Sequence, residues 1–379
     1  MSRRASDNLI LYDTSNFEEY PIGGQITSIR NFLRYVAECH PDVVSRTLLV
    51  GVSLNPNAIG EVSKIRISGQ DFRFLPVALA EPDQGHTKSS LRLKYVKGLM
   101  RHLPKVDFAK STINYIHTPE AYGPVRLRGK GSCAIFSHGS FFNMQKGFRF
   151  YKDSWISKMF QCYLNWTIKS ADRLFVIDDD SYAQYIKQNK NVSFVSNSID
   201  YREQVRRSVN PSAIKLLFVG RLSAVKNIGP IIEAAESLPE IASLAVVGEG
   251  EEGDNLRAMA GPKTIFTGAL GKNAVRDQMR ASDILVMNSN FEGVPMSILE
   301  AMGMGLPIVS TDVGGVSQVV SFGENAEKTI GTSNSIALAV TKIMKNYYYY
   351  SNNSFEYSKK YMYQEINKSI FESLLKMSK

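Results

Sequence analysis

Short apolar runs alternate with amphipathic segments along almost the whole chain, and no other feature of the sequence restricts the fold as strongly. Residues 25–39 place Ile26, Ile29, Phe32 and Leu33 on one helical stripe. Strands without polar alternation are typical of a parallel sheet covered on both faces. The first half therefore predicts an α/β domain with strands at 9–12, 47–53, 72–79, 114–117, 133–138, 173–177 and 192–196.

The same alternation starts again after a polar stretch that ends in Asn210-Pro211. A chain of 379 residues is longer than one hydrophobic core usually supports. We therefore expect two Rossmann-like, doubly wound α/β domains facing a central cleft, over residues 1–200 and 201–345. Residues 346–379 predict a polar break and then a helical segment that crosses back to the first domain. Strands of the second domain are predicted at 215–220, 244–248, 264–268, 283–288 and 307–311.

Composition narrows the class of protein. The chain has no run of about 18 apolar residues, so we expect no membrane-spanning helix. The N-terminal stretch lacks the pattern of a secretory signal. The three cysteines are odd in number and do not have metal-ligand spacing, which favours reduced thiols. We expect a cytoplasmic protein.

The formal net charge of +9 is concentrated partly in residues 88–105. There, basic and apolar residues alternate in the pattern of a basic amphipathic helix, which suits an anionic membrane surface. We expect a peripheral association with the inner face of the cell membrane; the alternative is a solvated basic face on a core helix. No zinc-finger, homeodomain or RRM-like pattern is present, so no nucleic acid partner is expected. The basic residues are Lys88, Arg92, Lys94, Lys97, Arg101 and Lys105.

The stretch NFEGVPMSILEAMGMGLPIVSTDVGG, residues 290–315, holds two glutamates eight positions apart. It follows the strand at 283–288, so Glu292 lies in a strand-to-helix loop and Glu300 on the helix. In open α/β sheets, ligands bind beyond the carboxyl ends of strands, where helix N-termini present free N–H groups. Eight helical residues rise about 12 Å, which is too far for a shared metal but fits a ligand with hydroxyls at both ends. The residues expected to bind it also include Gly293, Val294, Met296 and Ser297.

The segment FVGRLSAVKN supplies two cations at the same expected edge. A strand ends at Gly220, and Arg221 and Lys226 flank the turn that follows. A guanidinium and an ammonium at this place can stabilise the growing negative charge of a diphosphate leaving group. The alternative is a pair of ordinary exposed loop cations.

Weaker candidates come from the first half. Gly23-Gly24 lies between a strand and a helix and permits close approach to a phosphate or sugar. His138 ends a strand and could bind sugar hydroxyls or phosphate, although such a histidine is often structural. Residues 178–180 are three aspartates that could bind a metal ion; their place before a helix favours a capping role.

Four segments, FVGRLSAVKNIGPIIEAA, VVGEGEE, FTGAL and the stretch 290–315, together resemble the donor-binding domain of the retaining family-4 glycosyltransferases with the GT-B fold. Gly23-Gly24, His138 and VSFVSNSID resemble the N-terminal half of that family more loosely. The resemblance implies a metal-independent transferase that uses a nucleotide-diphosphate sugar, with UDP as the expected nucleotide. It also implies that the departing phosphate helps to deprotonate the acceptor hydroxyl on one face of the sugar.

The same resemblance implies individual roles. Glu292 lies near the donor sugar, where it positions and stabilises rather than attacks, and Glu300 binds the ribose. Arg221 and Lys226 hold the diphosphate, with Gly24 near it, and His138 contacts the sugar. The backbone near Gly268 and Leu270 sets the choice of base. Ser196 and Ser198 stand where the family often has Pro and Gly, which leaves the role of Asp200 open.

We therefore expect transfer of a hexose or N-acetylhexosamine to a hydroxyl of a glycan or lipid-linked glycan in cell-envelope polysaccharide synthesis. The alternative is a non-catalytic partner subunit with the GT-B fold that stabilises another transferase at the membrane. Transfer that is unaltered by Glu292→Gln would favour the alternative.

Overall fold

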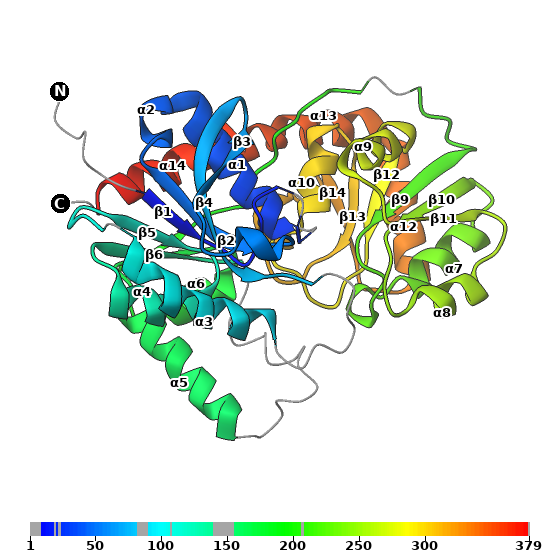
Figure 1. The fold of residues 1–379 in the computed structure, drawn as a ribbon. Helices are drawn as coiled ribbons and strands as arrows, with labels where there is room; N and C mark the ends of the chain where they lie inside the picture. Colours follow the sequence, from blue (N-terminus) through cyan, green and yellow to red (C-terminus); the bar gives the residue numbers. More distant parts are fainter. Residues whose placement is uncertain are drawn as a thin grey trace. The chain divides into compact units, whose positions relative to one another are not determined.

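The computed structural model describes residues 9–18, 20–21, 24–81, 90–106, 108–138, 155–205 and 208–377, apart from the side chains of residues 156, 157 and 179. The chain divides into two compact units (Figure 1). Unit 1 contains Met1–Ser196 and Tyr363–Lys379, and unit 2 contains Asn197–Met362.

Unit 1 is built on an eight-stranded sheet with the order β3-β4-β2-β1-β5-β6-β7-β8. All neighbouring strands are parallel except β3, which pairs antiparallel with β4 at the edge. The order runs outward in both directions from β1, as in a doubly wound sheet. The strands are β1 (Leu9–Tyr12), β2 (Thr47–Ser53), β3 (Ser63–Ile67), β4 (Gln70–Leu79), β5 (Ile113–Ile116), β6 (Ser132–Ser137), β7 (Arg173–Val176) and β8 (Val192–Phe194).

Helices cover both faces of this sheet. One buried cluster joins alternate strand residues such as Ile10 and Val50 to Tyr95, Val125 and Leu164 on one helix layer. That layer contains α3 (Leu91–His102), α4 (Tyr122–Arg128), α5 (Trp155–Ser170) and α6 (Asp179–Tyr185). The other helices of the unit are α1 (Gly24–Cys39), α2 (Pro41–Val44) and α14 (Tyr363–Leu375).

The last helix, α14, packs on α1. The ring of Phe371 lies 6.4 Å from that of Phe32, and it stacks on His40 at 4.2 Å between centroids. The Tyr363 hydroxyl donates a hydrogen bond to Glu38. The apolar stripe of α1 is therefore covered by a segment that lies more than 320 residues later in the sequence.

Unit 2 is built on a six-stranded, all-parallel sheet with the order β11-β10-β9-β12-β13-β14. Its strands are β9 (Ile214–Val219), β10 (Ile241–Val247), β11 (Thr264–Gly268), β12 (Ile284–Met287), β13 (Ile308–Thr311) and β14 (Ala326–Thr329). Its helices are α7 (Gly229–Ser237), α8 (Gly253–Met259), α9 (Lys272–Ala281), α10 (Met296–Gly303), α11 (Val316–Val319), α12 (Ser333–Lys345) and α13 (Tyr347–Tyr357).

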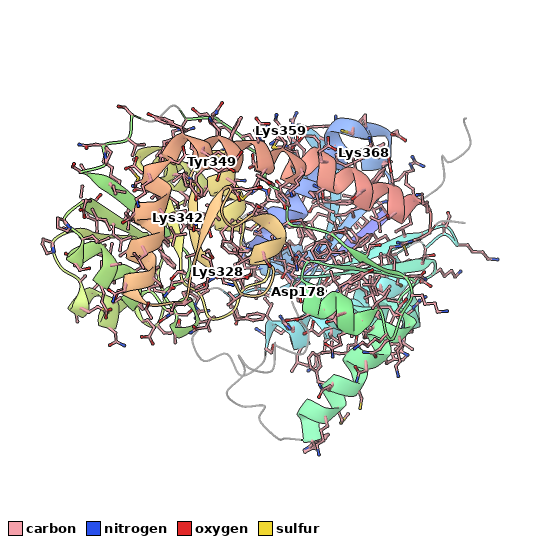
Figure 2. The ribbon with its side chains drawn as sticks, turned by 180° about the vertical axis from the view of Figure 1, so that it is seen from behind. Asp178, Lys328, Lys342, Tyr349, Lys359 and Lys368 are labelled. Atoms are coloured by element: carbon pink, nitrogen blue, oxygen red, sulfur yellow. The ribbon has the colours of Figure 1, made fainter. Side chains whose placement is uncertain are left out.

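The polar break predicted after residue 346 is wrong, because α13 forms there. Tyr347 and Tyr350 are buried in the core of unit 2. The Tyr347 hydroxyl donates to the Asp283 carbonyl at 3.0 Å, and the Tyr350 hydroxyl donates to Glu327 at 2.5 Å. Figure 2 labels Tyr349, which is exposed on the outside of α13. Tertiary packing thus overrides the weak helix preference of YYYYSNNS.

The predicted architecture of two doubly wound α/β domains is confirmed. No helix in the described ranges is long and apolar enough to cross a bilayer.

Candidate functional site

The order of strands in unit 2 reverses between β9 and β12. From β9 the chain moves outward to β10 and β11, and then crosses back to place β12 on the other side of β9. Such a switch point leaves a crevice at the carboxyl ends of the two strands, because their outgoing connections run in opposite directions. The loops after β9 and β12 carry Arg221, Lys226 and Glu292, so the topology brings these predicted residues to one edge.

Lys226 and Glu292 meet at this switch point. The Lys226 ammonium bonds to Oε1 of Glu292, and the same oxygen accepts a hydrogen bond from the Ser289 hydroxyl at 2.5 Å. Glu292 is 8% exposed, and Ser289 is fully buried. The two loops are also tied by their backbones, since the Asn290 N–H donates to the Val225 carbonyl at 2.8 Å. One oxygen of the carboxylate therefore accepts from two donors, and the cation beside it is partly buried.

The glycines near the end of the stretch 290–315 lie directly against the Glu292 loop. Gly314 has a φ of +54°, and a Cβ there would lie 1.8 Å from the Glu292 carbonyl oxygen. The Gly315 N–H donates to the Gly293 carbonyl at 3.1 Å. The loop after β13 thus supports the loop after β12 from behind, and only a residue without a side chain fits between them.

Replacement of Gly314 with alanine should destabilise unit 2 by about 2–4 kcal/mol, from the left-handed φ and the clash with the Glu292 carbonyl. Gly323→Ala is the matched control, because Gly323 has a φ of +89° with nothing within 4 Å of its Cβ position. Urea unfolding of both variants separates the cost of the left-handed φ from the cost of the clash with the Glu292 carbonyl. Equal losses would mean that the contact with Glu292 contributes nothing.

Arg221 lies farther out on the same edge. Its guanidinium pairs with Glu251 at 3.1 Å, and its side chain is 74% exposed. Gly220 follows β9 and donates to the Val247 carbonyl at 3.0 Å. Gly268 ends β11 with a φ of +74°, and its carbonyl accepts from the Gly248 N–H at 2.9 Å. The Arg221 side chain is thus more accessible to a ligand than the partly buried Lys226 side chain.

The helix α10 carries the other predicted residues. Pro295 precedes its first residue, Met296, so the free N–H groups of its first turn lie next to the Glu292 loop. Val294 is buried, and its carbonyl accepts from the Asn197 side chain at 2.8 Å. Met296 and Ser297 form the first turn, and Gly293 and Leu270 are partly exposed in their loops.

Glu300 lies one turn further along α10, in a charged environment. Burial raises the pKa of its carboxyl to about 7; the negative charge of Asp200 adds to the rise, and Lys272 and Arg276 oppose it. Asp200 itself bonds to Lys272 at 2.7 Å and to Arg276 at 2.8 Å. Although burial acts to raise the pKa of Asp200, the hydrogen bond and charges of these two cations lower it overall. Asp200 therefore neutralises a basic pair on α9 beside Glu300.

The raised pKa of Glu300 makes stability depend on pH. Between about pH 4.5 and 7 the folded chain keeps a proton that the unfolded chain has lost, so this group's contribution to stability falls as pH rises. The shift corresponds to about 3 kcal/mol, which partial exposure reduces to about 1–2 kcal/mol. As the pH rises from 5 to 8, the free energy of unfolding of Glu300→Gln should therefore increase by about this much relative to that of the native chain. Urea unfolding at the two pH values measures the difference. The exposed Glu233→Gln is the control, and a Glu300→Gln difference that does not change with pH would contradict the prediction.

The switch point of unit 1 lies between β1 and β5. Asp13, which follows β1, accepts hydrogen bonds from Gln25 at 2.6 Å and from Thr118, which follows β5, at 3.1 Å. Asp13 is 1% exposed, and its burial raises its pKa, although the hydrogen bonds oppose the rise. Gly24 is the first residue of α1, so the Asp13–Gln25 bond fixes the start of that helix beside it. Gly23 lies outside the described residues.

His138 has a partner that the sequence did not indicate. Its Nε2 lies 2.8 Å from Nδ1 of His117, and the two rings are stacked with centroids 5.0 Å apart. Burial lowers the pKa of His138 to about 3; burial and then the neighbouring His138 hold the pKa of His117 well below its usual range. Both rings are therefore neutral between pH 5 and 8. His117 follows β5 and His138 follows β6, the adjacent strand.

Sequence reasoning missed Ser289, Asp13 and His117. The one available signal was position, because each residue follows the end of a strand within two places.

The aspartate at 178 is the N-cap of α6, with its side chain accepting from the Ser181 N–H at 2.8 Å (Figure 2). In the described part of the chain, no group of three or more His, Cys, Asp or Glu side chains could hold a metal ion.

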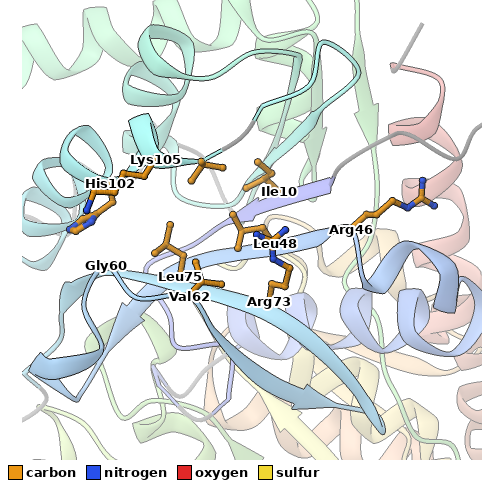
Figure 3. A pocket seen from close by; sticks show the side chains of 10 residues that line it. Ile10, Arg46, Leu48, Gly60, Val62, Arg73, Leu75, His102 and Lys105 are labelled. Atoms are coloured by element: carbon orange, nitrogen blue, oxygen red, sulfur yellow. The ribbon is translucent and has the colours of Figure 1, made fainter.

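A pocket of unit 1 lies apart from these residues (Figure 3). It contains the second residues of β1 and β2, near the amino-terminal ends of the strands. Because ligands of parallel sheets bind at the opposite ends, this pocket is separate from the switch point of unit 1. It is lined by Ile10, Arg46, Leu48, Gly60, Val62, Arg73, Leu75, His102, Lys105 and Val106.

The predicted basic helix 88–105 is described from residue 90, as α3 and the turn after it; Lys88 lies outside the described ranges. Its apolar residues Tyr95, Leu99 and Leu103 are buried in the core of unit 1. Arg92 pairs with Glu120 at 2.7 Å, and Lys94 with Glu81 at 3.1 Å. The apolar stripe of this helix thus faces the sheet, while Lys97, Arg101 and Lys105 are exposed.

Comparison with known proteins matches the second half of the chain to one family. The profile of the family described as glycosyl transferases group 1 matches residues 213–346. TuaC of Bacillus subtilis, a putative teichuronic acid biosynthesis glycosyltransferase, is 34% identical over 140 residues. The match covers 36% of this chain and 35% of TuaC, so the chain spans about a third of the length of that relative.

Solved structures match over nearly the whole chain. Sucrose-phosphate synthase from Thermosynechococcus elongatus has a TM-score of 0.76 at 15% identity, covering 97% of this chain and 98% of that one. Anabaena Alr3699/HepE in complex with UDP and glucose has a TM-score of 0.69 at 16% identity, covering 97% and 99%. The family match lies in unit 2, and the structural matches extend over both units. The chain therefore has the GT-B glycosyltransferase fold, and its residues 213–346 in unit 2 match the group 1 glycosyl transferases.

Proposed function

We propose that the chain is a retaining glycosyltransferase that moves a hexose or N-acetylhexosamine from a nucleotide-diphosphate sugar to a hydroxyl group. The observation that carries the proposal is the Lys226–Glu292 pair at the switch point of unit 2. A buried carboxylate beside a cation at this edge offers an acceptor for sugar hydroxyls and a donor for phosphate oxygens, side by side.

The chemistry assigned to these residues is electrostatic. When the bond between the sugar and the diphosphate breaks, negative charge accumulates on the leaving phosphate. Lys226 and the exposed Arg221 are the groups that stabilise this charge in the proposal, and they do so more strongly in the transition state than in the ground state. In binding phosphate, Lys226 exchanges its bond to Glu292 for bonds to the ligand. Glu292, still held by Ser289, then accepts hydroxyls of the donor sugar.

The other residues of the edge are assigned to the nucleotide. Glu300 accepts hydrogen bonds from the ribose, and the backbone around Gly268 and Leu270 faces the base. The expected nucleotide is UDP, which is also bound in the Anabaena structure. His138 is assigned to the sugar. Because the two cations neutralise the diphosphate in this proposal, activity should persist in the presence of a chelator.

The acceptor is proposed to be a glycan or lipid-linked glycan of the cell envelope. The support is the relative named for teichuronic acid biosynthesis. The exposed cations Lys97, Arg101 and Lys105 are proposed to face an anionic membrane surface by charge alone, since the apolar stripe of α3 is buried.

The test begins with thermal shift measurements of the full chain against a panel of nucleotide sugars. We expect a UDP-sugar to raise the melting temperature, and transfer from the selected donor to be reduced at least 100-fold by Glu292→Gln. Product linkage analysis then checks that the anomeric configuration is retained. Unaltered transfer in Glu292→Gln, or no stabilisation by any nucleotide sugar, would overturn the proposal and favour a non-catalytic partner subunit.

A further inference from the structure

The outer face of α5 is apolar over three turns. Trp155 is 70% exposed, Met159 is 61% exposed and Trp166 is 44% exposed. With the exposed Cys162 they follow the spacing i, i+4, i+7, i+11, which places them on one side of a helix. Trp155 and Trp166 are the two tryptophans of the whole chain. A residue type that is usually at least half-buried is thus concentrated on one exposed stripe.

The opposite side of α5 fixes this orientation. Leu164 and Ile168 are buried in the core of unit 1. The Tyr163 hydroxyl accepts from the Gly123 N–H at 2.9 Å and donates to the Pro119 carbonyl at 3.0 Å, which ties α5 to α4 and the turn before it. Since one face of α5 is already packed on the sheet, the tryptophan stripe is a second apolar face.

The three helices α3, α4 and α5 carry charge of one sign. The sequences of α3, α4 and α5 contain no Asp or Glu. Neighbouring helices add Leu93 and Leu127 as exposed apolar side chains, at 59% and 74%. The exposed basic side chains of the same three helices are Lys97, Arg101, Arg128, Lys158 and Lys169.

The other helices of the same unit provide a contrast. None of the large exposed apolar side chains of the described chain belongs to α1, α2 or α14. These helices carry Glu38 and Glu372 as well as basic residues. The combination of exposed aromatic side chains and purely basic charge is therefore a property of helices α3, α4 and α5 and not of the unit as a whole.

We propose that the outer face of α5 inserts into the interface of an anionic lipid bilayer, with Trp155, Met159 and Trp166 among the headgroups and upper acyl chains. Tryptophan favours this depth because its ring is apolar and its N–H remains hydrated. Lys158 and Lys169, which lie beside the stripe on the same helix, then meet the lipid phosphates. A protein partner would need a groove that is both apolar and lined by acidic residues, whereas an anionic bilayer combines negative charge and an apolar interior over any length. The inference does not depend on glycosyl transfer.

The experiment is co-sedimentation of the full chain with vesicles of phosphatidylglycerol and phosphatidylcholine, with pure phosphatidylcholine vesicles for comparison. All tryptophan emission comes from the stripe, so it reports insertion directly. We expect binding to the anionic vesicles with emission shifted to shorter wavelength, and at least tenfold weaker binding for the double variant Trp155→Glu with Met159→Glu. Leu338→Glu, at an apolar side chain 73% exposed on α12, should bind like the native chain.

A second double variant, Lys158→Glu with Lys169→Glu, leaves the apolar stripe intact and should also lose binding, more strongly at low salt. The proposal is overturned if the native chain does not sediment with anionic vesicles, or if Trp155→Glu with Met159→Glu binds them equally well. It is also overturned if sedimentation velocity shows a dimer of this chain that the same variant abolishes and vesicles do not compete with. Vesicle binding measured without donor or acceptor stays informative even if the transferase proposal fails.

Discussion

Replacement of Lys226 with methionine should lower the kcat of glycosyl transfer about 100- to 1,000-fold. The ammonium is the partly buried cation of the unit 2 switch point, where a cation acts more strongly than in bulk water because the surrounding dielectric is low. The exposed Arg221 should contribute less, so Arg221→Met is expected to raise KM for the donor more than it lowers kcat. Steady-state kinetics with a saturating donor separate the two effects.

The same substitution affects the fold, and a second variant separates this effect from catalysis. Lys226→Met leaves the buried carboxylate of Glu292 without its cation, which should cost about 3 kcal/mol of stability. Combining it with Glu292→Gln removes the unpaired charge and should restore most of that loss in urea unfolding, while activity stays low. Recovery of transfer together with stability would mean that Lys226 has only a structural role.

Replacement of His117 with phenylalanine should lower kcat/KM for the donor about tenfold or more, although His117 is assigned no contact with substrate. Nε2 of His117 has no hydrogen-bond partner among the described residues, and a buried N–H is rarely left unpaired. His117 therefore donates through Nδ1–H to Nε2 of His138, and His138 carries its own proton on Nδ1. That N–H is the group that His138 can present to a sugar oxygen, which makes His117 a positioning residue.

His117→Asn is the matched variant, because its amide nitrogen lies near the place of the histidine Nδ1 and can still donate. We expect it to recover activity that His117→Phe loses. Nitrogen NMR of His138 should show protonation at Nδ1 in the native chain and a mixture of tautomers in His117→Phe. The native tautomer should persist down to about pH 5, since the pKa of His138 is about 3. An unchanged spectrum in His117→Phe would remove the positioning role.

Much of the fold could be predicted because its strands are continuous apolar runs. LILY, TLLVGVS and TIFTG form strands at the predicted residues. The edge strand SKIRI escaped prediction since only Ile65 and Ile67 of its side chains are buried. The helix at 347–357 escaped it for a different reason, because its stability comes from tyrosine contacts with Asp283 and Glu327, far away in the sequence.

The candidate site was predictable to the extent that it depends on topology. Residues placed after neighbouring parallel strands must share an edge, so the topology brings Lys226 and Glu292 together. The topology does not indicate which polar neighbours complete the site. Ser289 and His117 take their roles from side-chain directions that are set by packing, and neither has a local pattern around it. The pKa of Glu300 likewise depends on Asp200, Lys272 and Arg276, which come from a linker and another helix.

The return of α14 to the first unit has a consequence for biosynthesis. Unit 2 is one continuous segment, whereas unit 1 lacks the cover of α1 until residues 363–375 have left the ribosome. The half that is translated first is thus completed last, and its apolar α1 surface stays open to chaperones while unit 2 is being made.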